Sequence, residues 1–121
     1  MDLGLSGKVA LVAAASRGLG RAVAEELARE GAHLVICARG GEALAETAAA
    51  IRAETGVRVV DVVADLSSMA DIATIVERAR VEFGQVDVLV TNGGGPPAGP
   101  FEAHSAEAWA EAVRQNLVSV V

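Results

Sequence analysis

Apolar and polar residues along the chain follow two alternating patterns. Short, almost continuously apolar segments are typical of strands buried on both faces of a sheet, and such segments occur at 8–13, 33–37, 58–63 and 87–91. Longer segments with apolar residues at every third or fourth position predict amphipathic helices at 18–30, 42–54 and 69–83. A further helix is expected to begin near Ser105. Strands and helices therefore alternate, with short connections between them.

The expected helices carry recognisable signals at their ends. Gly31, Gly56 and Gly84 each follow a helical segment, where glycine readily takes the left-handed conformation that ends a helix. Ser68 and Asp71 have the spacing of a capping box at the start of segment 69–83. That segment is the most clearly amphipathic one, and its predicted apolar stripe consists of Ile72, Ile75, Val76, Ala79 and Phe83.

The alternation of strands and helices predicts an α/β fold with a Rossmann-type parallel sheet. Helices of this length connect parallel strands by right-handed crossovers, so we expect helices on both faces of the sheet. With the expected strands numbered along the chain, their order in the sheet should be 3-2-1-4, the first half of a doubly wound fold. Residues 1–121 are then a single domain.

The last expected helix ends abruptly. Its apolar residues continue to Val120 and Val121, with no glycine, capping residue or polar tail. We therefore expect the chain to be cut within this helix, so that it is the N-terminal part of a larger domain. Segment 87–91 would then lie at an open sheet edge, which predicts pairing with a partner chain or aggregation.

Composition narrows the class of protein. The chain is 52% hydrophobic, yet no apolar run is long enough to span a bilayer and no signal sequence precedes the first strand, so we expect a cytoplasmic protein. A net charge of -6 and 2% aromatic residues argue against nucleic-acid binding. The single cysteine, Cys37, permits no internal disulfide or cysteine-based metal site and is expected to fill core space.

Small residues dominate the turn between the first strand and the first helix. Ala13, Ala14 and Ala15 lead into Ser16 and a glycine pair that opens the helix, whose first-turn amides and positive dipole end favour an anion. Small side chains let a pyrophosphate approach such a backbone closely. The residues predicted to contact a cofactor here are Ala14, Ser16, Arg17, Gly18, Leu19 and Gly20. A plain tight turn between strand and helix fits the same residues.

Two arginines are expected to lie near one another at this end of the sheet. Arg39 follows the second strand, where a site that prefers NAD(H) usually has an acidic residue that binds the ribose 2′-hydroxyl. Together with Arg17 it can form a clamp for a 2′-phosphate, which favours NADP(H) over NAD(H). The alternative is that both are solvated loop residues.

Three further polar positions have both a functional and a structural interpretation. Asp65, followed by Leu66, either accepts a hydrogen bond from an adenine amino group or caps a turn before the third helix. Asn92 begins the loop after the fourth strand, and by themselves Asn92, Gly93 and Gly94 indicate a simple flexible turn. Asn116 falls on the apolar stripe of the last helix, where an amide needs a partner.

Three motifs in this order resemble the short-chain dehydrogenase/reductase family. Segment 13–20 resembles its Thr-Gly-x-x-x-Gly-x-Gly turn, with alanine at the first two positions. Segment 87–94 resembles its Asp-x-Leu-Val-Asn-Asn-Ala-Gly segment, with Thr91 and Gly93 as substitutions. In the family this segment packs beside the adenosine ribose, so the resemblance implies that Asn92, Gly93 and Gly94 bind the cofactor. Trp109 and Asn116 resemble the helix that carries the asparagine of the family's Asn-Ser-Tyr-Lys tetrad. The resemblance covers essentially the whole chain and is strongest to members like 3-oxoacyl-[acyl-carrier-protein] reductase.

The resemblance implies reversible hydride transfer between NADP(H) and a carbonyl compound or secondary alcohol, in a homotetramer. Asn116 would be a catalytic residue that holds a water of a proton relay, although a satisfied core amide explains it as well. The family's Tyr-x-x-x-Lys lies beyond Asn116, and the chain has no tyrosine. We therefore expect the nucleotide-binding half of a reductase, inactive by itself. Because alanine does not enter positive φ freely, Ala14 predicts a looser or differently bent turn.

Two other classes of function fit the residues. One is a nucleotide-binding or interaction module without enzymatic activity, which would pair with a partner through its open sheet edge. The other is an unstable fragment with no activity of its own. Stable folding and cofactor binding by the chain alone would favour the module, whereas poor solubility without cofactor binding would favour the fragment.

Overall fold

The computed structural model describes residues 3–92, 105–108 and 110. In these residues the strands are β1 (Val9–Val12), β2 (His33–Ala38), β3 (Val59–Val63) and β4 (Val88–Val90). The helices are α1 (Gly18–Arg29), α2 (Gly41–Thr55) and α3 (Met69–Phe83). Strands and helices thus alternate as expected. Residues 106–108 and 110 are also helical, and the Ser105 hydroxyl accepts a hydrogen bond from the Ala108 amide at 3.1 Å, which confirms a helix start near Ser105.

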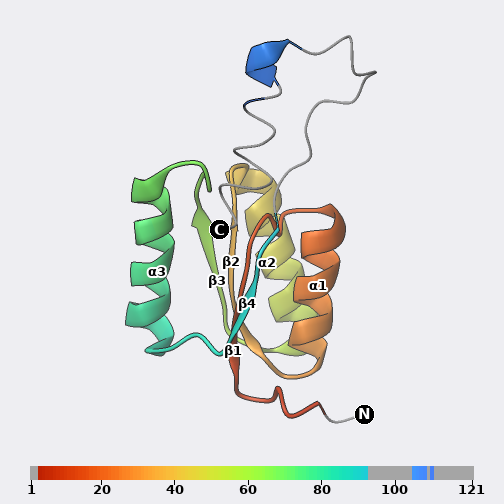
Figure 1. Ribbon diagram of the computed structural model, residues 1–121. Helices are drawn as coiled ribbons and strands as arrows, with labels where there is room; N and C mark the ends of the chain where they lie inside the picture. Colours follow the sequence, from red (N-terminus) through yellow and green to blue (C-terminus); the bar gives the residue numbers. More distant parts are fainter. Residues whose placement is uncertain (1–2, 93–104, 109, 111–121) are drawn as a thin grey trace.

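The four strands form one parallel sheet in the order β3-β2-β1-β4. Leu11 of β1 pairs with Val35 of β2 on one side and with Leu89 of β4 on the other. Helices α1 and α2 cover one face of the sheet and α3 covers the other (Figure 1). The predicted parallel α/β sheet, its strand order and its helices on both faces are therefore confirmed.

Strand β2 lies at the centre of the core and is buried on both faces. Leu34 and Ile36 pack toward α1 and α2, while Val35 and Cys37 pack toward α3, and all four are fully buried. This alternation follows from the two-residue period of a strand. Burial raises the pKa of the Cys37 thiol, which donates a weak hydrogen bond to the Val12 carbonyl. The prediction that this cysteine fills core space is confirmed.

Helix α3 covers less of the sheet than its sequence predicts. Ile75 and Ala79 are buried and Ile72 and Phe83 are half-buried, but Val76 is 57% exposed. The five-residue stripe is therefore wrong at Val76. Ile75 and Ala79 lie one turn apart and contact the sheet, whereas Val76 lies roughly 100° around the helix from Ile75 and points away from that contact.

Glycine ends two of the helices as predicted. Gly56 and Gly84 cap α2 and α3 in the left-handed conformation, with φ of +76° and +79°, and each donates its amide to a carbonyl of the last turn. In α1 the C-cap is Glu30, and Gly31 takes the left-handed conformation one residue later. The sequence thus located all three helix ends to within a residue.

The predicted capping box at the start of α3 is half present. The Ser68 hydroxyl accepts a hydrogen bond from the Asp71 amide at 3.2 Å, as expected. The Asp71 carboxylate, however, accepts from the amide of Asp65 at 2.8 Å rather than from Ser68. It reaches this partner because the chain turns back between β3 and α3. The side chain of Asp71 therefore ties the first turn of α3 to the loop that follows β3.

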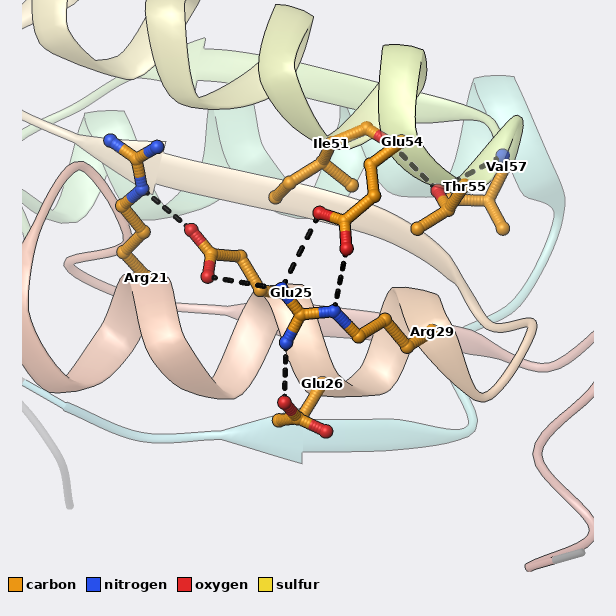
Figure 2. Close-up of polar contacts among 8 residues, drawn as sticks. All are labelled: Arg21, Glu25, Glu26, Arg29, Ile51, Glu54, Thr55 and Val57. Carbon is orange, nitrogen blue, oxygen red and sulfur yellow. Dashed lines mark hydrogen bonds and ion pairs between the residues drawn. The ribbon is translucent and has the colours of Figure 1, made fainter.

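An ion-pair network joins α1 to α2 on the outer surface (Figure 2). The Arg29 guanidinium of α1 donates to the Glu54 carboxylate of α2 at 2.8 Å and also binds Glu26 of its own helix. Arg21 pairs with Glu25 one turn along α1 at 2.7 Å. The hydrogen bond from Arg29 holds the pKa of Glu54 below its ordinary value of 4.5.

We predict a pH-dependent stability contribution from Glu54. A carboxyl whose pKa is lowered by folding stabilises the folded state above its ordinary pKa of 4.5, and this contribution is lost as the pH falls through the lower, folded value. Glu54→Gln should therefore lower the free energy of unfolding slightly at pH 7 and not at all in strong acid. Urea unfolding across this pH range measures the difference. Glu46→Gln, on the exposed side of the same helix, is the control, and equal effects of both variants at every pH would contradict the prediction.

Within the described residues, no helix has the length and apolar character that crossing a membrane requires.

Candidate functional site

A cavity of about 590 Å³ lies at the carboxyl ends of the four strands. Its wall consists of the loops after β1, β2 and β3, together with Asn92 after β4 and Ala43 in the first turn of α2. In open parallel sheets this edge is where ligands bind, because the helix N-termini and strand-to-helix loops converge there. The fold thus places one concave surface at the edge where the sequence predicted a cofactor site.

The cavity brings together most of the residues that the sequence singled out. These are Ala14, Ser16, Arg17, Gly18, Leu19, Arg39, Asp65, Leu66 and Asn92. Gly20 lies just behind the wall, while Gly93, Gly94 and Asn116 lie outside the described residues. The lining also includes residues that the sequence did not single out, namely Ala38, Gly40, Ala43, Ala64 and Ser67. They are all small and, except for Ala43, flank predicted positions.

The turn after β1 is held by the strands on both sides of it. The Ala13 amide donates to Val90 of β4 and the Ala15 amide donates to Cys37 of β2, each at 3.1 Å. The Asn92 side-chain amide adds a longer hydrogen bond of 3.5 Å to the Ala13 carbonyl. Because the flanking residues are fixed in this way, the conformation of the turn is determined by its neighbours.

Ala14 takes the left-handed conformation that such a turn requires. Its φ is +51°, a positive value that no other residue except glycine has in the described part of the chain. A side chain in this region costs about 1 kcal/mol relative to glycine. The alanine therefore keeps a glycine-like turn under strain, and the hydrogen bonds of Ala13 and Ala15 hold it there.

Gly20 is required by close packing. An added Cβ would lie 2.2 Å from the Ala14 carbonyl oxygen and 2.9 Å from the Asn92 side-chain nitrogen. Its lack of a side chain lets the first turn of α1 pack directly on the turn after β1. The small residues of this segment thus have two roles. Gly20 lets α1 pack on the turn after β1, while Ala14 and Gly18 line the cavity.

Two positively charged side chains line the cavity. Arg17 is the N-cap of α1 and makes no side-chain capping hydrogen bond, and Arg39 follows β2. Both are exposed, and neither forms an ion pair or hydrogen bond with another described residue. The first-turn amides and dipole of α1 add to this charge. An anion such as a phosphate is the ligand that this arrangement favours.

Asp65 also lines the cavity and lies in the loop after β3. Its carboxylate accepts hydrogen bonds from the amide and the hydroxyl of Ser67, at 2.9 Å and 2.7 Å. This is an Asx turn that leads into α3, and it confirms the turn-capping interpretation. Contact between Asp65 and an adenine ring stays a prediction.

Thr47 is a residue of this region that sequence reasoning missed. It belongs to α2 and is fully buried, and its hydroxyl donates to the Ser16 carbonyl in the turn after β1 at 3.0 Å. A signal was present, since Thr47 stands on the helical stripe of Leu44, Ala48 and Ile51, where a hydroxyl needs a buried partner.

Other candidate groups lie away from the cavity or have structural partners. His33 begins β2 at the opposite end of the sheet, where its Nδ1 accepts from the Arg58 amide at 3.0 Å and its ring stacks on Phe83. His33 is thus the first residue of β2, where the sequence predicts that the strand begins. Among the described residues, no group of three or more histidine, cysteine or acidic residues is placed to hold a metal ion.

The fold and the site together define a Rossmann-type α/β protein with a cavity lined by two arginines at the carboxyl edge of its sheet. The chain belongs to the short chain dehydrogenase family, whose model matches residues 8–121. It is 37% identical over 119 residues to 3-oxoacyl-[acyl-carrier-protein] reductase FabG of Escherichia coli, covering 98% of this chain and 47% of that protein. It is 34% identical over 116 residues to the rhamnolipids biosynthesis 3-oxoacyl-[acyl-carrier-protein] reductase of Pseudomonas aeruginosa, covering 96% and 44%. The chain thus spans about half the length of these relatives.

Solved structures give the same result. L-sorbose reductase of Gluconobacter frateurii, complexed with NADPH and L-sorbose, superposes with a TM-score of 0.90 at 36% identity, covering 98% of this chain and 45% of that one. A short-chain dehydrogenase/reductase of Burkholderia phymatum in complex with NAD superposes with a TM-score of 0.88 at 35% identity, covering 96% and 41%. The family resemblance inferred from the three motifs is therefore confirmed.

Proposed function

We propose that this chain is the nucleotide-binding part of an NADP(H)-dependent oxidoreductase that transfers hydride between the cofactor and a carbonyl compound or secondary alcohol. The observation that carries the proposal is the pair of arginines, Arg17 and Arg39, that line one cavity together with the N-terminus of α1. Membership of the family supports oxidoreductase chemistry and favours it over an interaction module without enzymatic activity.

Each part of the cavity suits one part of the cofactor. The pyrophosphate would lie at the start of α1, next to Gly18, where backbone amides and the helix dipole favour negative charge. The 2′-phosphate would contact Arg39 and Arg17, and the adenine would lie near Asp65 and Leu66. The loop of Asn92, Gly93 and Gly94 would pass beside the adenosine ribose. When bound, the cofactor supplies or accepts the hydride.

The preference for NADP(H) over NAD(H) rests on charge. A 2′-phosphate needs cationic donors, and the residue after β2 is Arg39 rather than an acid. Two structural relatives carry related ligands, NADPH in L-sorbose reductase and 5-hydroxy-NADP in an alcohol dehydrogenase of Thermococcus sibiricus. The NAD complex of the Burkholderia phymatum relative shows that members of this fold also take the other cofactor.

Equilibrium titration of the 121-residue chain tests the proposal. Reduced nicotinamide fluorescence should rise to saturation at one NADPH per chain, and the dissociation constant for NADH should be higher. Absence of saturable binding of either nucleotide by a chain that circular dichroism shows to be folded would contradict the proposal. A tighter NADH complex would overturn the cofactor preference alone.

We predict that the 121-residue chain alone does not oxidise NADPH in the presence of a ketone. Reduction of a carbonyl needs an acid that protonates the developing alkoxide, and the chain contains no tyrosine to serve as that acid. The assay follows absorbance of NADPH at high concentrations of chain and ketone. Reproducible turnover that scales with the concentration of the pure chain would show the prediction to be wrong.

The resemblance to the family also carries two finer proposals. Asn116 would hold a water of the proton relay in the complete active site, and the complete protein would be a homotetramer. Light scattering of the complete protein tests the second of these. A monomer at micromolar concentration would contradict it.

A further inference from the structure

Thr47 is the one polar residue that is fully buried in the described part of the chain. It stands on the inner face of α2, and its neighbours on that face, Leu44, Ala48 and Ile51, are apolar core residues. A buried hydroxyl is costly unless it has a hydrogen-bond partner. The position therefore needs an explanation beyond packing, because valine has nearly the same shape and no such cost.

The partner of Thr47 is unusual for a helical threonine. Thr55 of α2 and Thr74 of α3 both donate to a carbonyl four residues earlier in their own helix, at 2.7 Å and 3.1 Å. Thr47 instead donates to the carbonyl of Ser16, which is 31 residues away and lies in the turn after β1. The hydroxyl thus links α2 to the turn that lines the cavity.

This hydrogen bond fixes the direction of an amide at the cavity wall. The Ser16 carbonyl and the Arg17 N–H belong to one trans peptide unit, so they point in opposite directions. When the carbonyl is drawn toward α2, the Arg17 N–H points away from that helix. Ser16 and Arg17 both line the cavity, and Arg17 is the N-cap of α1.

We propose that Thr47 is a positioning residue that orients the Ser16–Arg17 peptide so that the start of α1 binds the cofactor's phosphates. The proposal rests on the proposed NADP(H) binding. Its effect should be common to both nucleotides, because the pyrophosphate is common to them, whereas Arg39 should act on the 2′-phosphate alone. Thr47 and Arg39 are therefore distinguishable by the ratio of the two affinities.

The experiment compares Thr47→Val, Thr47→Ser and a matched control in the 121-residue chain. Thr47→Val keeps the shape and removes the donor, and we expect it to weaken NADPH and NADH binding equally, by about tenfold. Thr47→Ser keeps the hydroxyl and should retain the wild-type affinity for both. The control Thr55→Val removes a hydroxyl that donates to the Ile51 carbonyl of the same helix (Figure 2), and it should leave both affinities unchanged.

Amide hydrogen exchange in the ligand-free chain supplies a second measurement. In Thr47→Val the hydrogen-exchange rate or the chemical shift of the Arg17 amide should differ from that of the wild type. In Thr47→Ser both quantities should match the wild type. If Thr47→Val does not fold, Thr47→Cys, a weak donor of similar size, should have an affinity between those of Thr47→Ser and a non-binding chain.

The outcomes separate the two proposals. Wild-type chain that binds neither nucleotide would overturn the proposed function and this inference together. Wild-type chain that binds NADPH while Thr47→Val, or Thr47→Cys in its place, binds equally well would overturn only the role of Thr47. Loss of affinity in Thr47→Ser as large as that in Thr47→Val would also overturn it, because a chain that keeps the hydroxyl would then bind no better than one that lacks it.

Discussion

Gly20→Ala should abolish measurable NADPH binding and lower the free energy of unfolding by about 2–3 kcal/mol, in the range of overpacking substitutions. The added methyl would lie 2.2 Å from the Ala14 carbonyl oxygen, and backbone atoms cannot yield as a flexible side chain does. The first turn of α1 must then move away from the turn after β1, which separates the amides of the proposed phosphate site. Urea unfolding and nicotinamide fluorescence measure the two effects.

The control for this prediction is Gly40→Ala. It adds the same methyl group at another wall of the cavity, where an added Cβ has no atom within 4 Å and φ is -88°. We expect its stability to match the wild type closely. A Gly20→Ala chain with unchanged stability and NADPH affinity would show that the close contact between α1 and the turn is not present in solution.

Arg39→Asp should reverse the cofactor preference. Hydrogen bonds to a charged group contribute roughly 1.5–3 kcal/mol each, so loss of the guanidinium should weaken NADPH binding by about tenfold to a hundredfold. NADH affinity should stay the same or rise, because an aspartate at this position accepts a hydrogen bond from the ribose 2′-hydroxyl. Parallel titrations of NADPH and NADH measure the ratio of the dissociation constants.

Arg78→Asp is the matched control for Arg39→Asp. Arg78 is an exposed residue of α3 outside the cavity lining, and the substitution changes the net charge of the chain by the same amount. Its ratio of NADPH to NADH affinity should equal that of the wild type. If Arg39→Asp left the ratio unchanged as well, the assignment of Arg39 to the 2′-phosphate would be wrong.

Much of the fold follows from local patterns in the sequence. Strand β2 could be predicted because most of its residues are apolar on both faces. This pattern is typical of a parallel strand that helices cover on both sides. The helix ends could be predicted because Gly56 and Gly84 adopt the left-handed conformation that ends a helix, and glycine does so without help from tertiary contacts. The position of the cavity loops could also be predicted, since residues that directly follow parallel strands meet at one edge of the sheet.

What the sequence did not predict depends on partners far along the chain. Helical periodicity places the Thr47 hydroxyl on the buried stripe of α2, but it does not identify the Ser16 carbonyl, 31 residues away, as the partner. Val76 fits an apolar stripe in sequence, yet the contact of α3 with the sheet is narrower than that stripe. Ala14 shows the same limit, because strand hydrogen bonds on both sides hold an alanine in a conformation that its own propensity disfavours.

The loops after β1, β2 and β3 form the proposed nucleotide site. Amide chemical shifts of the 121-residue chain during titration with NADPH test it most directly. We predict the largest changes at Ser16, Arg17, Gly18, Arg39 and Asp65, and none at the opposite end of the sheet around His33 and Phe83. Changes centred on that opposite end, or no changes at saturating NADPH, would show that these loops do not form the nucleotide site.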